Sequence, residues 1–267
     1  MVGDLIRILF PYLPNATLQA SCRKGIILCD GKGGLFKIDD DRVSRGPFDM
    51  KNEIGKALVK AEMILDHLLL GIADLDRGIQ WVCEKTGLKP TTGGTHPGAG
   101  TRNALLSLGN RQYVEIISID PQQNVASRTT NLIRDLKIPR LITWAAVASD
   151  INVVARRAKS AGYAIEGPTD GSRVKPAGVT LRWKTLRVLS EFGDVIPFFI
   201  EWQGDVVHPS EDFPTGCRLM TFEIHHPDAD RVQQMLRNLG IDAIVKSGRE
   251  PNLQAVLSTP THFIHLP

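Results

Sequence analysis

The chain has 267 residues, of which 42% are hydrophobic and 23% are charged, a composition typical of a globular protein with a substantial core. It has no run of about 18 apolar residues, so a membrane-spanning helix is not expected. The 32 basic and 29 acidic residues give a net charge of +3, which is too weak to indicate a nucleic-acid partner. Four scattered cysteines without a CxxC pair predict reduced thiols and a cytoplasmic protein.

Residues 1–62 differ in pattern from the rest of the chain. Their apolar residues follow neither the period of a strand nor that of a helix over any sustained stretch. The glycines at positions 31, 33 and 34 lack the closing Gly-Lys-Ser/Thr of a phosphate-binding loop. We therefore predict a flexible or poorly structured extension over residues 1–62.

Three segments of the remaining chain share one spacing, which indicates an internal repeat. Each begins with a short apolar strand and passes through an aspartate into an amphipathic stretch that stops at a glycine. The aspartates, which suit the start of a helix, are Asp74, Asp150 and Asp228. The third residue of each strand lies seven positions before its aspartate, at His67, Thr143 and Thr221. The glycines follow the aspartates by 13, 12 and 12 positions, at Gly87, Gly162 and Gly240.

Further strands are expected after each predicted helix. Alternating or apolar runs place them over residues 104–108 and 112–119, 179–189 and 196–202, and 253–258 and 262–266. The repeated unit is then βαβββ, which predicts an α+β protein. Because a single unit leaves one sheet face uncovered, the units must pair. We predict paired modules over residues 63–210 and a third βαβββ-like unit over residues 211–267.

Polar side chains within apolar strands give the candidate site. Strand alternation predicts that His67, Glu115 and Glu201 turn inward, the two glutamates at matching places in the closing strands of two repeats. A buried carboxylate is costly unless it is paired or binds a metal. One histidine and two carboxylates suit a divalent ion such as Zn, Mn, Fe, Co or Ni. The alternative is a hydrogen-bonded core histidine, with glutamates paired to arginines.

Several motifs resemble the glyoxalase-like members of the vicinal oxygen chelate superfamily. They include Asp66-His67, the H-P-G-x-G-T-R-N run at residues 96–103, and the closing strand at residues 197–202. The resemblance covers residues 63–267 and implies that the modules curl into an open sheet with a cleft. It also implies a divalent metal on His67, Glu115 and Glu201, where adjacent oxygens of a substrate would chelate. Thr143 stands where a fourth ligand would be expected.

The glycine-rich run before residue 104 suggests a substrate-binding loop. Its glycines let backbone amides approach a ligand, and Arg102 can hold a carboxylate or phosphate with two donors. We expect His96, Arg102 and Asn103 to bind substrate, with His96 as a second candidate base. The alternative is a hairpin rich in turn glycines, with Arg102 exposed to solvent.

The leading functional interpretation is a metal-assisted lyase, isomerase or hydrolase that acts on a small oxygenated metabolite. Glu115 or Glu201 would serve as general base if burial raises its pKa. The first alternative is a non-catalytic protein that sequesters a small molecule in the same cleft without metal. A structural or interaction role for the third unit is the other alternative. The expected partner is a small molecule rather than nucleic acid or a membrane, and a homodimer is also considered.

Overall fold

The structure, a computed structural model, describes the backbone of four short segments before residue 46 and most of the chain from residue 65 onward. The four segments are residues 17–22, 25–29, 35–39 and 42–45. The later described ranges are residues 65–174, 180–204, 207–211, 213 and 215–267. The chain divides into two compact units, Met1–Ala61 and Glu62–Pro267.

The first unit contains a four-stranded antiparallel sheet in the order β1-β2-β3-β4. Its strands are β1 (Thr17–Cys22), β2 (Gly25–Cys29), β3 (Leu35–Asp39) and β4 (Arg42–Arg45). None of them is predicted from the sequence, because strands of four to six residues are too short for a sustained alternation to show. The expectation that residues 1–62 form a flexible extension stays a prediction.

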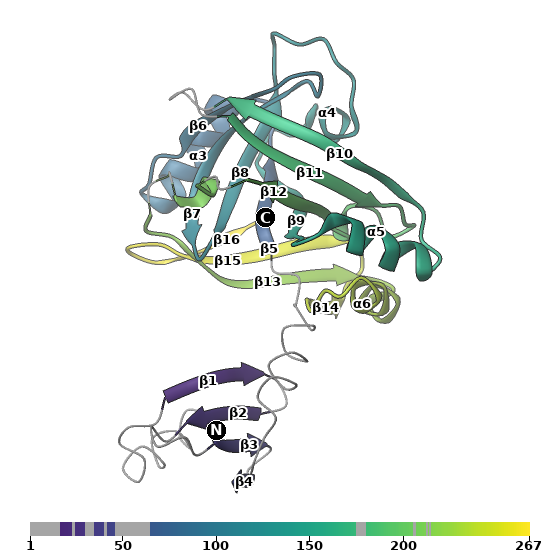
Figure 1. Cartoon of the computed structure of the whole chain (residues 1–267). Coiled ribbons are helices and arrows are strands. Elements are labelled where there is room, and N and C mark those ends of the chain that lie inside the picture. Colours follow the sequence, from purple (N-terminus) through teal and green to yellow (C-terminus); the bar gives the residue numbers. More distant parts are fainter. Residues whose placement is uncertain are drawn as a thin grey trace. The chain divides into compact units, whose positions relative to one another are not determined.

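The second unit is built on a strongly curled eight-stranded sheet in the order β10-β11-β12-β9-β5-β8-β7-β6 (Figure 1). The first module comprises β5 (Leu65–Gly71), α3 (Leu75–Thr86), β6 (Thr91–His96), β7 (Thr101–Gly109) and β8 (Gln112–Ile119). A short helix, α4 (Arg128–Ile133), follows it. The second module comprises β9 (Arg140–Val147), α5 (Ile151–Ser160), β10 (Ile165–Val174), β11 (Thr180–Val188) and β12 (Phe198–Gln203).

The two modules join through their first strands at the centre of the sheet. Strand β5 runs antiparallel to β9, whereas it runs parallel to β8, and β9 runs parallel to β12. Each module is therefore βαβββ, as predicted from the repeat. The middle strands β6 and β10 are not predicted individually. Their sequences, TTGGTH and IEGPTDGSRV, carry the glycines and the proline that usually mark turns.

The predicted helix boundaries are present at the expected residues. The Asp74 carboxylate accepts hydrogen bonds from the backbone N–H groups of Asp76 and Arg77, at 2.9 and 3.2 Å. Asp150 accepts a bond from the N–H of Asn152 at 2.8 Å. Asp228 precedes α6 (Ala229–Asn238) without a side-chain capping bond.

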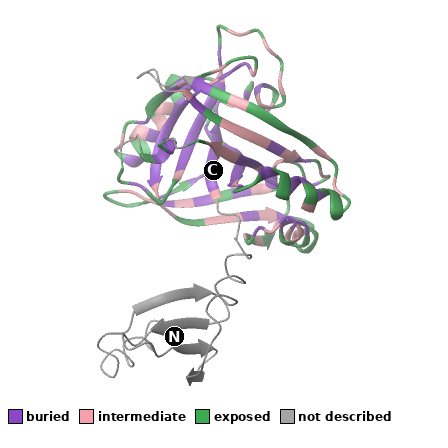
Figure 2. Cartoon of the chain, viewed as in Figure 1, coloured by how far each residue is buried: buried purple, intermediate pink, exposed green. Residues whose placement is uncertain are grey.

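Strand alternation divides the residues of the eight-stranded sheet between two faces. The face that carries Leu68, Val114, Trp144 and Phe199 is covered and forms the main core. Helix α3 packs against β7 and β8, and α5 packs against β10, β11 and β12. Figure 2 shows the buried residues concentrated along these strands. The opposite, concave face is therefore the one left to line a cleft.

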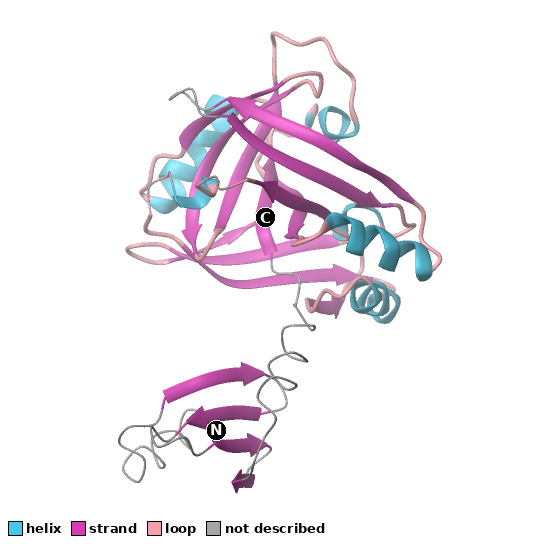
Figure 3. Cartoon of the chain, viewed as in Figure 1, coloured by secondary structure: helices cyan, strands magenta, loops and turns pink. Residues whose placement is uncertain are grey.

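Within Glu62–Pro267, the predicted third βαβββ-like unit forms a separate four-stranded sheet with one helix (Figure 3). Its strands are β13 (Arg218–His226), β14 (Ile244–Ser247), β15 (Asn252–Ser258) and β16 (Phe263–Leu266), in the order β14-β13-β15-β16. Phe222 packs against Trp144 of β9, with ring centroids 5.1 Å apart. The predicted third βαβββ-like unit is confirmed, while the exact boundaries at residues 63, 210 and 211 stay predictions.

Two further features bear on the sequence predictions. Cys83 and Cys217 are free thiols. Within the part of the chain that the structure describes, no helix is long and apolar enough to cross a membrane.

Candidate functional site

A cleft of about 590 Å³ occupies the concave face of the eight-stranded sheet. Strands from both modules contribute to its lining, which combines apolar walls with a few polar groups. The apolar and aromatic side chains include Leu69, Leu105, Ile117, Trp183, Phe198, Ile200 and Trp202. The ionisable side chains are His67, His96, Glu115, Glu166, Asp170, Arg173 and Arg187, together with the phenol of Tyr113. A largely apolar cleft with a few convergent polar groups is the usual form of a small-molecule site.

A bulge in β5 brings the side chains of two successive residues together, of which His67 lines the cleft. The pairing of β5 with β9 shifts between Leu65 and His67, which leaves Asp66 as the extra residue. A bulge of this kind re-aims side chains that a regular strand would turn to opposite faces. The Nδ1–H of His67 donates to Asp66 Oδ1 at 2.7 Å. The His67 ring also stacks on Tyr113, with centroids 4.5 Å apart.

Asp66 is a buried carboxylate that accepts three hydrogen bonds. Besides His67, the Nε1–H of Trp202 donates to Asp66 Oδ2 at 2.9 Å, and the Nε2–H of His208 donates to the same oxygen at 3.2 Å. Burial alone would raise the pKa of Asp66, but the bonds from His208 and His67 outweigh burial and hold that pKa well below its usual range. Asp66 is therefore an anion that fixes the tautomer and the orientation of His67.

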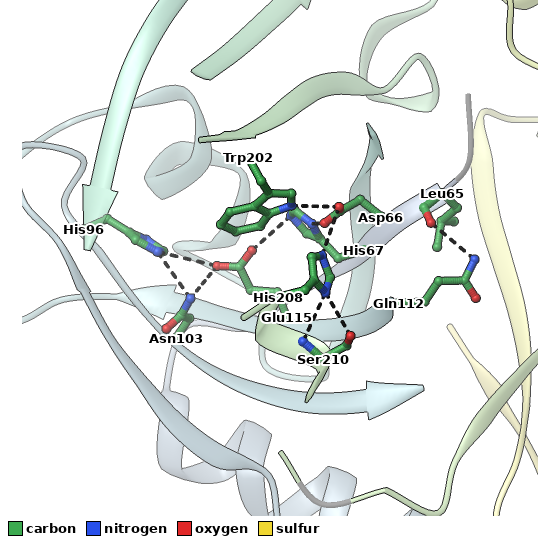
Figure 4. A network of polar contacts seen from close by, with 10 residues as sticks. All are labelled: Leu65, Asp66, His67, His96, Asn103, Gln112, Glu115, Trp202, His208 and Ser210. Carbon is green, nitrogen blue, oxygen red and sulfur yellow. Dashed lines mark hydrogen bonds and ion pairs between the residues drawn. The ribbon is translucent and has the colours of Figure 1, made fainter. Parts of the chain in front are cut away.

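Glu115 of β8 lies between two imidazole rings (Figure 4). Its Oε2 is 3.4 Å from Nε2 of His67, and its Oε1 is 3.6 Å from Nε2 of His96. The side-chain amide of Asn103 donates to Glu115 Oε1 at 2.7 Å. His67 and Glu115 are only 3% and 7% exposed, so water screens their interaction weakly.

The orientation of the Asn103 amide is set from the second module. Arg173 of β10 donates from Nη1 to Asn103 Oδ1 at 3.4 Å, which leaves the amide nitrogen to face Glu115 and His96. This nitrogen lies 3.2 Å from His96 Nε2, and Nδ1 of His96 lies 2.8 Å from Thr101 Oγ1. His96 thus accepts at Nε2 and donates at Nδ1.

Burial is the main cause of a lowered pKa at His96. The charges of Arg173 and His67 lower this pKa further, while Glu115 opposes the shift. The ring is therefore neutral near neutral pH, and both of its nitrogens are engaged with neighbours. This arrangement makes His96 a positioning group for Asn103 and Glu115 rather than a free acid.

The structure does not bring Glu201 to this cluster, although the sequence predicts convergence with His67 and Glu115. Glu201 accepts hydrogen bonds from the backbone N–H of Ile151, at 2.6 Å, and from the amide of Gln203. Its neighbours on β12, Ile200 and Trp202, line the cleft, and alternation turns Glu201 to the opposite face. There it binds the first helical N–H of α5.

Strand register explains this difference. In the first module Leu69 pairs with Glu115, and in the second module Ala145 pairs with Phe198. Leu69 and Ala145 are equivalent because each lies two residues after the matched His67 and Thr143. Phe198 therefore occupies the position that corresponds to Glu115. The sequence suggests matching Glu201 with Glu115, but Glu201 lies an odd number of residues after Phe198. That match therefore assigns the side chains of β12 to the wrong faces of the sheet.

The three residues predicted to bind substrate do not all line the cleft. His96 and Asn103 line the cleft, but both engage Glu115. Arg102, which alternates with Thr101 and Asn103 on β7, is not among the residues that line it. Adjacent residues of a regular strand face opposite sides, so Arg102 and Asn103 do not share a face.

The donor set does not fit the divalent metal that the resemblance implies. The first module supplies His67 and Glu115, whereas the corresponding positions of the second module hold Thr143 and Phe198, of which the phenylalanine has no donor atom. Across residues 65–267, within the ranges that the structure describes, no group of three or more His, Cys, Asp or Glu side chains is placed to hold a metal ion.

Four residues of the site are not predicted as site residues from the sequence: Asp66, Arg173, Trp202 and His208. Asp66 stands next to His67 in the Asp-His motif, but alternation alone would place it on the other face. His208 lies in a loop before the short turn η2 (Pro209–Glu211), where its Nδ1 accepts from the N–H of Ser210 at 3.3 Å. A buried polar residue outside a strand gives no periodic pattern to detect.

Comparison with known proteins assigns this fold and cleft to a family. A family model described as glyoxalase-like domain matches residues 65–240, so the chain belongs to the glyoxalase-like domain family. This agrees with the resemblance of the sequence motifs to glyoxalase-like proteins.

One of the solved structures that resemble this chain supports the same fold. A hypothetical protein from Staphylococcus aureus is 14% identical, with a TM-score of 0.60 over 76% of this chain and 98% of that chain. Methylmalonyl-CoA epimerase from Mycobacterium tuberculosis is 22% identical, with a TM-score of 0.41 over 54% of this chain and 92% of that chain. No curated protein matches the chain.

Proposed function

We propose that this protein is an enzyme that moves a proton on a small oxygenated metabolite, in the manner of an isomerase or a lyase. The observation that carries the proposal is the pair formed by His67 Nε2 and Glu115 Oε2, 3.4 Å apart on the floor of a cleft. The substrate class is a compound with an acidic hydrogen next to a carbonyl group. We infer from the cleft that the binding partner is a small molecule.

The hydrogen bonding around the pair supports proton transfer. Since His67 donates from Nδ1 to the Asp66 anion, a neutral His67 ring presents an Nε2 lone pair to Glu115. A base of this kind can take a proton from a bound substrate and return it, which is general acid–base catalysis. Asn103 and Asp66 hold the two groups in place from either side.

Hydrogen exchange tests the proposal directly. The wild-type protein would be incubated in D2O with lactate, acetoacetate, levulinate, mandelate and simple acyl thioesters, and loss of the hydrogen next to the carbonyl group followed by proton NMR. We expect exchange with at least one compound, and a fall of about 100-fold or more in Glu115→Gln, as for loss of a general base. Glu201→Gln is the matched control, since Glu201 lies outside the cleft lining. Equal rates in wild-type and Glu115→Gln protein would contradict the proposal.

The alternative is a non-catalytic binding protein, which the aromatic walls of the cleft favour. Trp183 and Trp202 both line it, with ring centroids 5.6 Å apart, and offer a large apolar surface to a ligand. Saturable binding of a compound without any exchange would support this alternative.

The divalent metal ion stays a separate prediction, as do a cytoplasmic location and a homodimer. Elemental analysis of protein purified without a histidine tag tests the metal. His67 and Glu115 are the two donors that one module offers, so stoichiometric metal that is lost in Glu115→Ala would support this prediction.

A further inference from the structure

The hydroxyl of Thr143 is buried in the wall of the cleft without a partner. Thr143 lies on β9, is 4% exposed and lines the cleft. Across the described residues, three buried side-chain polar atoms have no hydrogen-bond partner: Arg102 Nε, Thr143 Oγ1 and Ser190 Oγ. Only Thr143 among these belongs to the cleft lining.

Two other buried hydroxyls are satisfied within the chain. Thr86 donates to the carbonyl of Val82 at 2.7 Å, and Ser107 donates to the carbonyl of Ser210 at 2.6 Å. Leaving a buried hydroxyl without a partner is unfavourable, and native structures do it rarely. An unpartnered hydroxyl in a ligand cleft therefore indicates an atom supplied by the ligand.

The position of Thr143 relative to the acid–base pair is fixed by strand register. His67 pairs with Ala145 across β5 and β9, while Thr143 pairs with Leu69. His67 and Thr143 are thus diagonal neighbours on one face, a relationship that corresponds to about 7–8 Å. A small molecule can span that distance and contact both side chains at once.

The surroundings of Thr143 are apolar. Its direct partner Leu69 belongs with Ile117 to a small apolar cluster against which Phe198 packs, and all three of these side chains line the cleft. A ligand seated here would place hydrocarbon against this cluster, with one oxygen reaching the hydroxyl. The site would distinguish an oxygenated compound from the same compound without that oxygen, because only the former satisfies Thr143.

We propose that Thr143 is a specificity-determining residue, which selects a hydroxy or oxo group on an otherwise apolar part of a small carbonyl compound, the substrate class proposed above. The second module would then contribute a substrate contact at the position that corresponds to His67 in the first. This inference rests on the proposed function, in that the cleft is taken to be the substrate site.

Matched pairs of acids test the proposal by binding alone. Lactate is compared with propionate, acetoacetate with butyrate, levulinate with valerate, and mandelate with phenylacetate, each titrated by ligand-observed NMR. The measurements use the Glu115→Gln protein, so that binding is measured without turnover. A failure of selectivity is then separate from a failure of the exchange reaction, which is measured on the wild-type protein.

We expect at least one oxygenated acid to bind about tenfold more tightly than its partner, and this preference to disappear in Thr143→Val. Thr143→Ser should keep the preference, and Thr185→Val should keep it too, since Thr185 already donates to the carbonyl of Thr169 within the chain. The melting temperature of Thr143→Val should be unchanged or higher, because the variant removes an unsatisfied hydroxyl.

Three results would overturn the proposal. The first is the absence of any preference in all four pairs before Thr143 is changed. The second is a preference that survives in Thr143→Val. The third is a Thr143→Val protein that melts several degrees lower and binds both acids of each pair equally weakly. That result would show that Thr143 has a structural role in the sheet. If Thr143→Val does not fold, loss of the preference in Thr143→Ser with unchanged melting would equally count against it.

Discussion

The imidazole of His67 and the carboxylate of Glu115 face each other across 3.4 Å, and each is held from behind by a different partner. Asp66 fixes the ring, and Asn103 fixes the carboxylate. Asp66 lies in β5 together with His67, at a bulge opposite β9, whereas Asn103 of β7 reaches Glu115 from the neighbouring strand β8. The pair therefore depends on the register between strands, and changes that disturb either support should affect reactivity before they affect the fold.

Asp66→Asn tests the support behind His67. The amide would present a hydrogen where three donors now converge, so we expect a loss of about 3 kcal/mol of stability, typical of a broken buried charged pair. Because the folded pKa of Asp66 lies below its unfolded value, its contribution is complete above about pH 4 and declines as the pH falls toward the folded value. Urea unfolding at a series of pH values should show the wild-type advantage shrinking in acid. An advantage that grew in acid would contradict the assignment.

Gly93→Ala tests the support behind Glu115. A Cβ at Gly93 would overlap both Oδ1 of Asn103 and Nη1 of Arg173, so the two side chains would have to move. We expect exchange activity to fall about tenfold or more and stability to fall by about 1–3 kcal/mol, the cost of overpacking. Thr92→Ala, at an exposed position of the same strand, is the control. Full activity in Gly93→Ala would show that the Arg173–Asn103 contact has no part in positioning Glu115.

His96 provides a test of the electrostatics of the cleft. Burial lowers its pKa, so the folded state takes up fewer protons than the unfolded state below about pH 6.5. By linkage, His96 then reduces stability as the pH falls through that range, and His96→Gln should remove this part of the pH dependence. An NMR titration of the ring should give a midpoint below that of an exposed histidine. A midpoint above it would contradict the predicted direction.

Glu201→Gln tests whether Glu201 and Glu115 have different roles, although the sequence predicts the same role for both. Glu201 accepts from the first N–H of α5, where a negative charge is stabilised by the helix dipole. We expect a loss of about 0.3–1 kcal/mol in unfolding free energy and no change in exchange rate. A large drop in exchange rate with unchanged stability would show that Glu201 takes part in the reaction.

The repeat and its spacing are strong enough in sequence to predict the architecture. Matching Asp74 with Asp150 aligns His67 with Thr143, and this correspondence holds in the structure. Alternation also brings His67 and Glu115 to one face. These predictions succeed because each uses only local period and spacing along a single strand or helix.

What the sequence does not provide is the register between strands. Glu201 is predicted to face inward because its surroundings resemble those of Glu115, yet the pairing of β9 with β12 puts Phe198 in that position. The bulge at Asp66 likewise depends on the partner strand β9. Arg173 reaches Asn103 only because the sheet curls until strands β10 and β6 come into contact. Such contacts between distant segments leave no pattern in one sequence.

The exchange rate of the His67→Gln, Glu115→Gln double variant shows whether His67 and Glu115 work together in proton transfer. If the two side chains act as one proton-transferring unit, removal of either already disables it, because residues that act together are not additive. We expect the double variant to exchange substrate hydrogen at the same residual rate as each single variant, with all three proteins folded by circular dichroism. Losses that multiply in the double variant, or single variants that keep the wild-type rate, would contradict it.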